Sequence, residues 1–211
     1  IVFLMLRARR LVPRVFSIFA RTCTVDRPVR FGIGDVEQET KIPAREEFVP
    51  GNKSDPFLDS VEARDHLRWI MQKDSLGQDM LLMGENVSEM RHCVLEWLRL
   101  GGKEYEYVSL SQDTAHEDLR QRRELSNNSS IFVDQSAVRA AIHGRILLLE
   151  GIERVERNIL PLLNNLLENR EITLEDGRIL LPPHRAEALG IHSDSPSKKI
   201  VPVHKDFRVI G

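Results

Sequence analysis

The sequence predicts an α/β protein with a mainly parallel sheet, and three observations support this fold class. Short apolar runs alternate with longer stretches whose apolar residues recur at helical spacing. One run, Ile146–Leu149, is unbroken, as expected for a strand that is covered on both faces. Strands separated by helices form βαβ units, whose strands run parallel. With 41% hydrophobic residues among 211, the chain is able to bury one ordinary core.

The first half of the expected core is bounded by glycines. A helix over residues 57–76 ends at Gly77, and the apolar strand Met80–Met83 ends at Gly84. A second helix over 89–100 is closed by Gly101 and Gly102. Tyr105–Val108 is the second expected strand.

The second half begins with a helix that Asp134 is expected to N-cap and Gly144 to end, before the strand Ile146–Leu149. Asn158 is expected to cap a helix over 159–169, which places Pro161 in a first turn, where proline is tolerated. Residues 170–181 predict a β-hairpin, and residues 207–210 a last strand.

The N-terminal segment differs in charge from the rest of the chain. Residues 1–33 contain seven arginines and one aspartate, a net charge of +6, within a total of -2. This composition favours a mitochondrial transit peptide, and we expect the protein in mitochondria, in the matrix. The alternatives are a disordered tail or a fragment that lacks its true start. Residues 34–56, with several prolines, are interpreted as a linker, and residues 57–211 as the folded domain.

Several classes of function are disfavoured by composition. The longest apolar run, Ile1–Leu6, is far shorter than a membrane span. Cys23 and Cys93 stand far apart, so a disulfide scaffold or a cysteine-based zinc site is not expected. The small net charge gives no electrostatic reason to bind nucleic acid.

The first strand is followed by a segment that resembles a phosphate-binding loop only in part. Such a loop reads GxxxxGK followed by Ser or Thr, because glycine N–H groups, a lysine and a hydroxyl bind phosphate and Mg²⁺. Here only the leading glycine is present, and acidic and apolar residues replace the second glycine and the lysine. The alternative is a plain turn from strand to helix. The candidate residues are Gly84, Glu85, Asn86, Val87, Ser88, Glu89, Met90 and Arg91.

The third strand ends in Glu150-Gly151, where a nucleotide hydrolase would carry Asp-Glu. Glu150 is the candidate Mg²⁺ ligand and catalytic residue, but Gly151 leaves the position of the base without a side chain. Glu153 is the candidate substitute for that base. Its alternative is an ion pair in a solvated charged face.

Residues 66–210 resemble the first AAA+ module of large mitochondrial proteins that end in a von Willebrand factor A domain. The resemblance depends on four stretches, HLRWIMQKDSLGQDMLLMG, EYVSLSQDT with the nearby EDLRQRREL, LLLEGIERVERNILPLLNNLLENREITLEDGR, and FRVI. Within the third stretch, LLNNLLENREITLEDGR is also similar to the helix and hairpin of the dynein-related and MoxR-like AAA clade. The resemblance implies a P-loop NTPase-like (AAA+) three-layer αβα fold with a β-hairpin insert, incomplete at the C-terminus because Gly211 falls where the polar sensor residue would begin.

The resemblance further implies ATP and Mg²⁺ as ligands and other AAA+ subunits, or copies of this chain, as partners. We therefore expect an ATP-binding module with weak or absent hydrolysis on its own, acting in an oligomeric mitochondrial ATPase. The alternatives are a non-catalytic pseudo-ATPase interaction subunit and a truncated gene product.

Overall fold

The computed structural model describes residues 2–5, 30–51, 60–126, 129–159, 161, 164–190 and 199–211. The chain divides into two units, residues 1–105 with Ile210 and residues 106–209 with Gly211, and each unit is described by itself. Most of the expected leader lies outside the described residues. No helix in the described part has both the length and the apolar character that a membrane crossing requires.

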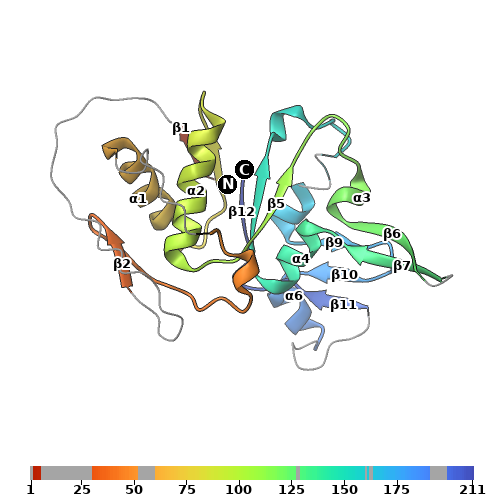
Figure 1. Cartoon of the computed structure of the whole chain (residues 1–211). Helices are drawn as coiled ribbons and strands as arrows, with labels where there is room; N and C mark the ends of the chain where they lie inside the picture. Colours follow the sequence, from red (N-terminus) through yellow and green to blue (C-terminus); the bar gives the residue numbers. More distant parts are fainter. Residues whose placement is uncertain are drawn as a thin grey trace. The chain divides into compact units, whose positions relative to one another are not determined.

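The first unit is built on strand β4 (Met80–Met83) and two helices, α1 (Val61–Ser75) and α2 (Val87–Gly101) (Figure 1). β4 has the bounds that the sequence predicts. β1 (Val2–Met5) pairs parallel with β4, and Ile210 pairs parallel with Met80 from the end of β12 (Arg208–Ile210). Ser60 caps α1 by accepting a hydrogen bond from the backbone N–H of Ala63 at 3.1 Å.

A hairpin that the sequence analysis did not predict covers α1. It consists of β2 (Arg30–Ile33) and β3 (Val36–Glu39), and Phe31 and Ile33 are buried. From β3, Gln38 donates to the carbonyl oxygen of Met71 at 2.9 Å. Residues 30–39, which the sequence analysis divided between leader and linker, therefore form one packed element. A short 3-10 helix, η1 (Glu46–Phe48), follows.

The second unit contains the strand order β12-β8-β5, with β8 (Ile146–Glu150) between its neighbours. β5 spans Tyr105–Ser109, and α4 (Ser136–His143) packs on β8. Leu147 and Leu149 of β8 belong to a core that also includes Ala140 and Phe207. The predicted α/β fold with a mainly parallel sheet is confirmed.

The second unit also contains the β6–β7 and β9–β10 hairpins, strand β11 and the short helices α3 and α6 (Figure 1). β6 pairs with β7, and β9 pairs with β10, which also pairs with β11. The β9–β10 hairpin was predicted, and the β6–β7 hairpin was not. The bounds are α3 His116–Leu119, β6 Gln121–Ser126, β7 Ser129–Asp134, β9 Ile172–Thr173, β10 Ile179–Leu181, α6 Pro183–Ala188 and β11 Ile200–Pro202.

Several local expectations differ from the structure. α1 begins at Val61, after its N-cap Ser60, and not at residue 57. Asp134 ends β7, and the N-cap of α4 is Gln135, because the hairpin extends to the residue where a cap was expected. Asn158 lies in a turn, and the following helix is described at Pro161 and Asn164 and as a π-helical segment, η4 (Asn165–Asn169). α2 begins at Val87 rather than at Glu89.

Candidate functional site

The candidate phosphate loop is short. Only Gly84, Glu85 and Asn86 separate β4 from α2, so the candidate residues from Val87 to Arg91 lie on the first turns of the helix. The first N–H groups of a helix have no partner within it, and the helix dipole favours an anion there. The loop therefore presents a helix N-terminus to a phosphate rather than a glycine-rich cradle. Gly84 is not among the glycines with positive φ.

An acidic side chain already lies at this helix N-terminus. The side-chain amide of Asn86, the N-cap residue, donates to Oε1 of Glu89 at 2.6 Å. Glu89 lies in the first turn, where a carboxylate interacts favourably with the helix dipole. Glu85 is also exposed in the loop. Both carboxylates oppose a bound polyphosphate.

Another candidate residue, Glu150, ends strand β8 in the second unit. Glu150 is half-buried, and the hydroxyl of Tyr107 on β5 donates to its Oε2 at 3.0 Å. The backbone of the same residue is fixed, because the Leu110 N–H donates to the Glu150 carbonyl oxygen at 2.7 Å. The sequence analysis missed Tyr107, since an aromatic residue at strand spacing indicates only a strand.

Gly151 has a backbone conformation that excludes a side chain. Its φ is 84° and its ψ is 33°, which is the left-handed region that glycine alone adopts readily. A Cβ atom at this position would lie 2.7 Å from the carbonyl oxygen of Leu110. The backbone conformation of Gly151 and the carbonyl oxygen of Leu110 thus both exclude a side chain at the position where a catalytic base would lie.

Glu153 follows on the 3-10 helix η3 (Ile152–Arg154), and its Oε1 accepts a hydrogen bond from Arg154 at 3.1 Å. Both side chains are exposed, at 69% for Glu153 and 65% for Arg154. This geometry matches the solvated ion pair that the sequence analysis gave as the alternative to a catalytic role.

The donor set fits Mg²⁺ with one protein carboxylate. In proteins Mg²⁺ keeps several waters and binds one or two carboxylates together with substrate phosphates. A single carboxylate such as that of Glu150 is therefore enough as the protein ligand. Within the described residues, no three His, Cys, Asp or Glu side chains gather as an all-protein metal site. The fit to a triphosphate is weaker, because the helix N-terminus of α2 suits an anion whereas Glu85 and Glu89 oppose it.

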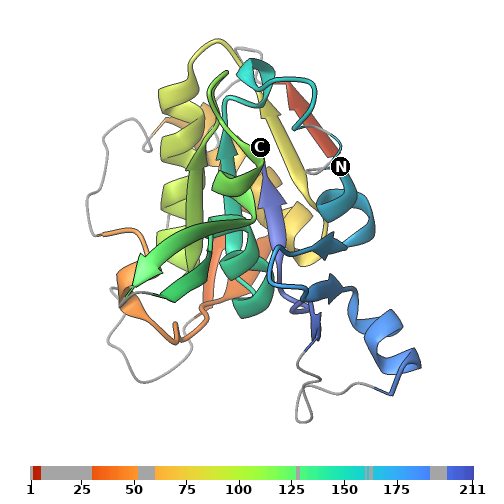
Figure 2. The same cartoon turned by 90° about the vertical axis from the view of Figure 1, so that its right-hand side faces the viewer.

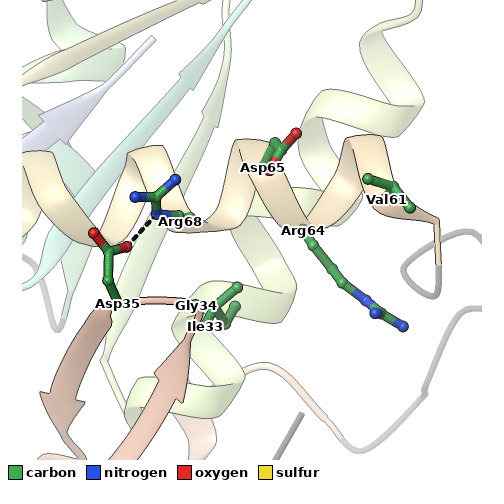
Figure 3. Close-up of a pocket in the computed structure, with 7 residues that line it drawn as sticks. All are labelled: Ile33, Gly34, Asp35, Val61, Arg64, Asp65 and Arg68. Atoms are coloured by element: carbon green, nitrogen blue, oxygen red, sulfur yellow. Dashed lines mark hydrogen bonds and ion pairs between the residues drawn. The ribbon is translucent and has the colours of Figure 1, made fainter. Parts of the chain in front are cut away.

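A separate cavity of about 400 Å³ lies in the first unit between the β2–β3 hairpin and α1 (Figure 3). Arg68 and Asp35 form an ion pair at 2.5 Å on one side of it. Arg64 and Asp65 also line it, so its acidic and basic side chains balance. None of the predicted site residues lines this cavity.

Comparison with known proteins gives a consistent picture. The family model for the AAA domain of the dynein-related subfamily matches residues 81–211, which include every candidate site residue. Over 183 residues, 85% of this chain, the sequence is 48% identical to von Willebrand factor A domain-containing protein 8 of Mus musculus. The chain spans 10% of the length of that relative. The resemblance stated from the sequence is confirmed.

Proposed function

Because this chain belongs to the dynein-related subfamily of AAA domains, we propose that it is an ATP-binding module that does not hydrolyse ATP unaided. We further propose that it acts within an oligomeric mitochondrial ATPase. The observation that carries this proposal is the backbone conformation of Gly151. It does not accommodate a side chain directly after Glu150, so the chain cannot place a general base at that position.

Each residue has a specific role in this proposal. The N-terminus of α2, from Val87, binds a phosphate through backbone N–H groups. Glu150, held by Tyr107, is the carboxylate for Mg²⁺, which neutralises phosphate charge when it is bound. Hydrolysis depends on stabilisation of transition-state charge, in related enzymes by an arginine finger worth about 10³-fold or more. In this proposal a neighbouring AAA+ subunit supplies that cation.

A nucleotide titration tests the proposal. Binding of a fluorescent ATP analogue is measured with Mg²⁺ and with EDTA, and phosphate release is followed in parallel. We expect saturable binding that weakens in EDTA, without phosphate release by the isolated chain. Flat titrations at millimolar nucleotide, or steady turnover by the isolated chain, would contradict the proposal.

A matched pair of variants tests whether Glu150 or Glu153 is the carboxylate that binds Mg²⁺. Glu150→Gln removes the charge that Tyr107 holds, whereas Glu153→Gln removes an equal charge from an exposed ion pair. We expect the difference between the Mg²⁺ and EDTA titrations to disappear in Glu150→Gln and to persist in Glu153→Gln. The reverse result would assign the role to Glu153.

The second candidate function is a pseudo-ATPase subunit that keeps the fold as an interaction scaffold. The contact between Asn86 and Glu89 favours it, because a carboxylate already occupies the region where a phosphate would bind. Glu62, an acidic residue in the first turn of α1, provides the matched control. If nucleotide binds Glu89→Gln but neither the wild type nor Glu62→Gln, and if the chain co-purifies with AAA+ subunits independently of ATP, this second function holds.

The mitochondrial location is part of the proposal and has its own test. Residues 1–33, fused to a fluorescent reporter, are expected to direct it to mitochondria because of their seven arginines. A fusion in which these arginines are replaced by glutamine is the control. A reporter that stays in the cytosol with the natural segment would contradict this location.

A further inference from the structure

The β6–β7 hairpin is held to the second unit at its base. Among the described strands, β6 and β7 pair with each other and with no third strand. At the far end Leu125 is 87% exposed, and Ile131 and Phe132 are also exposed, whereas Gln121 at the base is 1% exposed. Figure 2 shows the two hairpins of this unit from the side, with β6–β7 in green and β9–β10 in blue. The direction of β6–β7 is therefore set by the contacts at its base.

The β9–β10 hairpin, in contrast, is anchored in the core of the same unit. Ile172, Leu174 and Leu180 are buried and belong to the main apolar cluster. Two backbone hydrogen bonds close its turn, because the Leu174 N–H donates to the Arg178 carbonyl oxygen at 2.8 Å and the Gly177 N–H donates to the Leu174 carbonyl oxygen at 3.1 Å. This turn is a well-fixed support for a neighbouring element.

Four polar side chains connect the base of β6–β7 to this turn. The side-chain amide of Gln121 donates to Asp134 at 2.7 Å and to Asp176 at 2.9 Å, and its Oε1 accepts from the backbone N–H of Asp176 at 3.1 Å. Arg178 donates through Nε to Asp176 at 2.6 Å and through Nη2 to Asp134 at 2.5 Å. The guanidinium therefore bridges one carboxylate of β7 and one of the turn, for which its planar fork of donors is suited.

The two carboxylates of this cluster lie close together. Both are within hydrogen-bond distance of the same nitrogen atom of Gln121. Burial alone would raise the pKa of Asp176, but the hydrogen bonds from Gln121 and Arg178 and the charge of Arg178 outweigh it and lower the pKa. The side chains of Arg178, Asp134 and Asp176 are only 23% to 27% exposed, so solvent screens their charges incompletely. Without Arg178, Asp134 and Asp176 would repel each other.

We propose that Arg178 is a latch that positions the β6–β7 hairpin, because it neutralises Asp134 and Asp176 and so holds the base of β6–β7 against the β9–β10 turn. With the latch closed, the two hairpins move as one body. Loss of the charge of Arg178 releases β6–β7 to pivot about its base. A displacement of the exposed end of β6–β7 is thereby coupled to the core in which β9–β10 is anchored. The latch is independent of nucleotide binding, so either proposal is able to fail without the other.

The distance between two spin labels tests the latch. One label is attached at Leu125, at the exposed end of β6, and the other at Glu168, an exposed position of η4. The two natural cysteines are replaced by alanine so that only these positions react. We expect the distribution of distances to be at least twice as wide in Arg178→Gln as in the labelled parent chain, with circular dichroism showing that both are folded.

Two further variants separate the latch from a general loss of an ion pair. Arg122→Gln removes from β6 an ion pair of 2.6 Å with Asp118, which does not involve the β9–β10 turn, and is expected to keep the parent width. Asp134→Asn, added to Arg178→Gln, removes one of the two repelling charges and is expected to narrow the distribution again. A loss of packing alone would not be corrected by this second substitution.

Arg178→Lys keeps the charge but not the fork that spans both carboxylates, so we expect a width between those of the parent and Arg178→Gln. This variant decides the question if Arg178→Gln does not fold. The proposal is overturned if the folded variants of Arg178 keep the parent width, or if Arg122→Gln broadens the distribution equally. A double variant with Asp134→Asn that stays as broad as Arg178→Gln would also overturn it, since charge neutralisation would then not hold the hairpin.

Discussion

The carbonyl oxygen of Leu110 lies 2.7 Å from the point where a Cβ atom of residue 151 would stand. Gly177 has the same φ of 84°, but a Cβ atom there would meet nothing within 4 Å. Substitutions at the two glycines can therefore be compared. Both carry the energetic cost of a left-handed backbone, and only the one at residue 151 adds the cost of the contact with Leu110.

We predict that Gly177→Ala lowers the free energy of unfolding by about 1 kcal/mol, the cost of a positive φ for an L-residue. Gly151→Ala is expected to lower it by about 2 to 4 kcal/mol, because the contact with Leu110 adds to that cost. Chemical denaturation of both variants measures the difference. Equal losses would show that the surroundings of Gly151 relax without cost.

The same geometry predicts the outcome of an attempt to restore a catalytic base. Gly151→Glu places a carboxylate directly after Glu150 in sequence, yet the backbone does not accept its Cβ atom in the present conformation. We expect no phosphate release above that of the wild type. A folded Gly151→Glu protein that turns over ATP would contradict this.

Tyr107 is expected to position Glu150 for Mg²⁺. Tyr107→Phe removes the hydroxyl that lies 3.0 Å from Glu150 Oε2 and leaves the ring. We predict that nucleotide affinity in Mg²⁺ falls by about three- to tenfold, which corresponds to the net contribution of about 1 kcal/mol from one typical hydrogen bond. Tyr105→Phe, on the same strand β5, is the control. Loss of affinity that persists equally in EDTA would assign Tyr107 a purely structural role.

Gln38 joins the β2–β3 hairpin to α1 and α2. Its side-chain amide donates to Met71 and to Asp74 at 2.9 Å each, and its Oε1 accepts from the indole N–H of Trp97 at 3.3 Å. Trp97 is fully buried, so the loss of its partner leaves a buried donor unsatisfied.

We predict that Gln38→Ala lowers the free energy of unfolding by about 2 to 3 kcal/mol and alters the fluorescence of Trp97. Glu37→Ala, at the neighbouring exposed position, is expected to change it by less than about 0.5 kcal/mol. Comparable effects of the two variants would mean that the hairpin does not depend on this hydrogen-bond network.

The strands of the core were predictable because glycine and apolar runs mark their limits. β4 has the predicted bounds, and β8 exceeds its prediction by Glu150 alone. The β6–β7 hairpin was not predictable from periodicity, since Arg122, Arg123 and Glu124 indicate a solvated surface. Its base is fixed by tertiary contacts. Gln121 donates to Asp134 at 2.7 Å and to Asp176 at 2.9 Å, and the second of these residues lies 55 positions away in sequence.

The sequence was enough to predict which residue types form the candidate site, but not the contacts that these residues make. The sequence identifies Gly151 as an empty base position, whereas the contact with Leu110 that keeps it empty joins two different strand ends. The contact of Tyr107 with Glu150 likewise requires that β5 and β8 be neighbours. The early start of α2 depends on the N-cap conformation of Asn86, which no residue spacing reports.

The arginine contacts of Glu106 make the stability of the second unit depend on pH. It is 5% exposed and accepts hydrogen bonds from Arg139 at 2.9 Å and from Arg145 at 2.6 Å. Burial alone would raise the pKa of Glu106, but the hydrogen bonds and charges of these two arginines outweigh it and lower the pKa. A lowered pKa in the folded state contributes stability above the unfolded pKa of about 4.3, and this contribution is lost as the pH falls through the folded value.

We therefore predict that the free energy of unfolding decreases below about pH 4.3 and that Glu106→Gln removes this part of the decrease. At pH 7 the same variant is expected to be destabilised by about 3 to 5 kcal/mol, because Arg145, 3% exposed, loses the carboxylate it is paired with. Glu124→Gln, at an exposed position of β6, is the control and is expected to keep the wild-type pH profile. Urea denaturation from pH 3 to pH 7 measures all three proteins. If Glu106→Gln loses stability in acid as steeply as Glu124→Gln, other carboxylates account for the acid sensitivity.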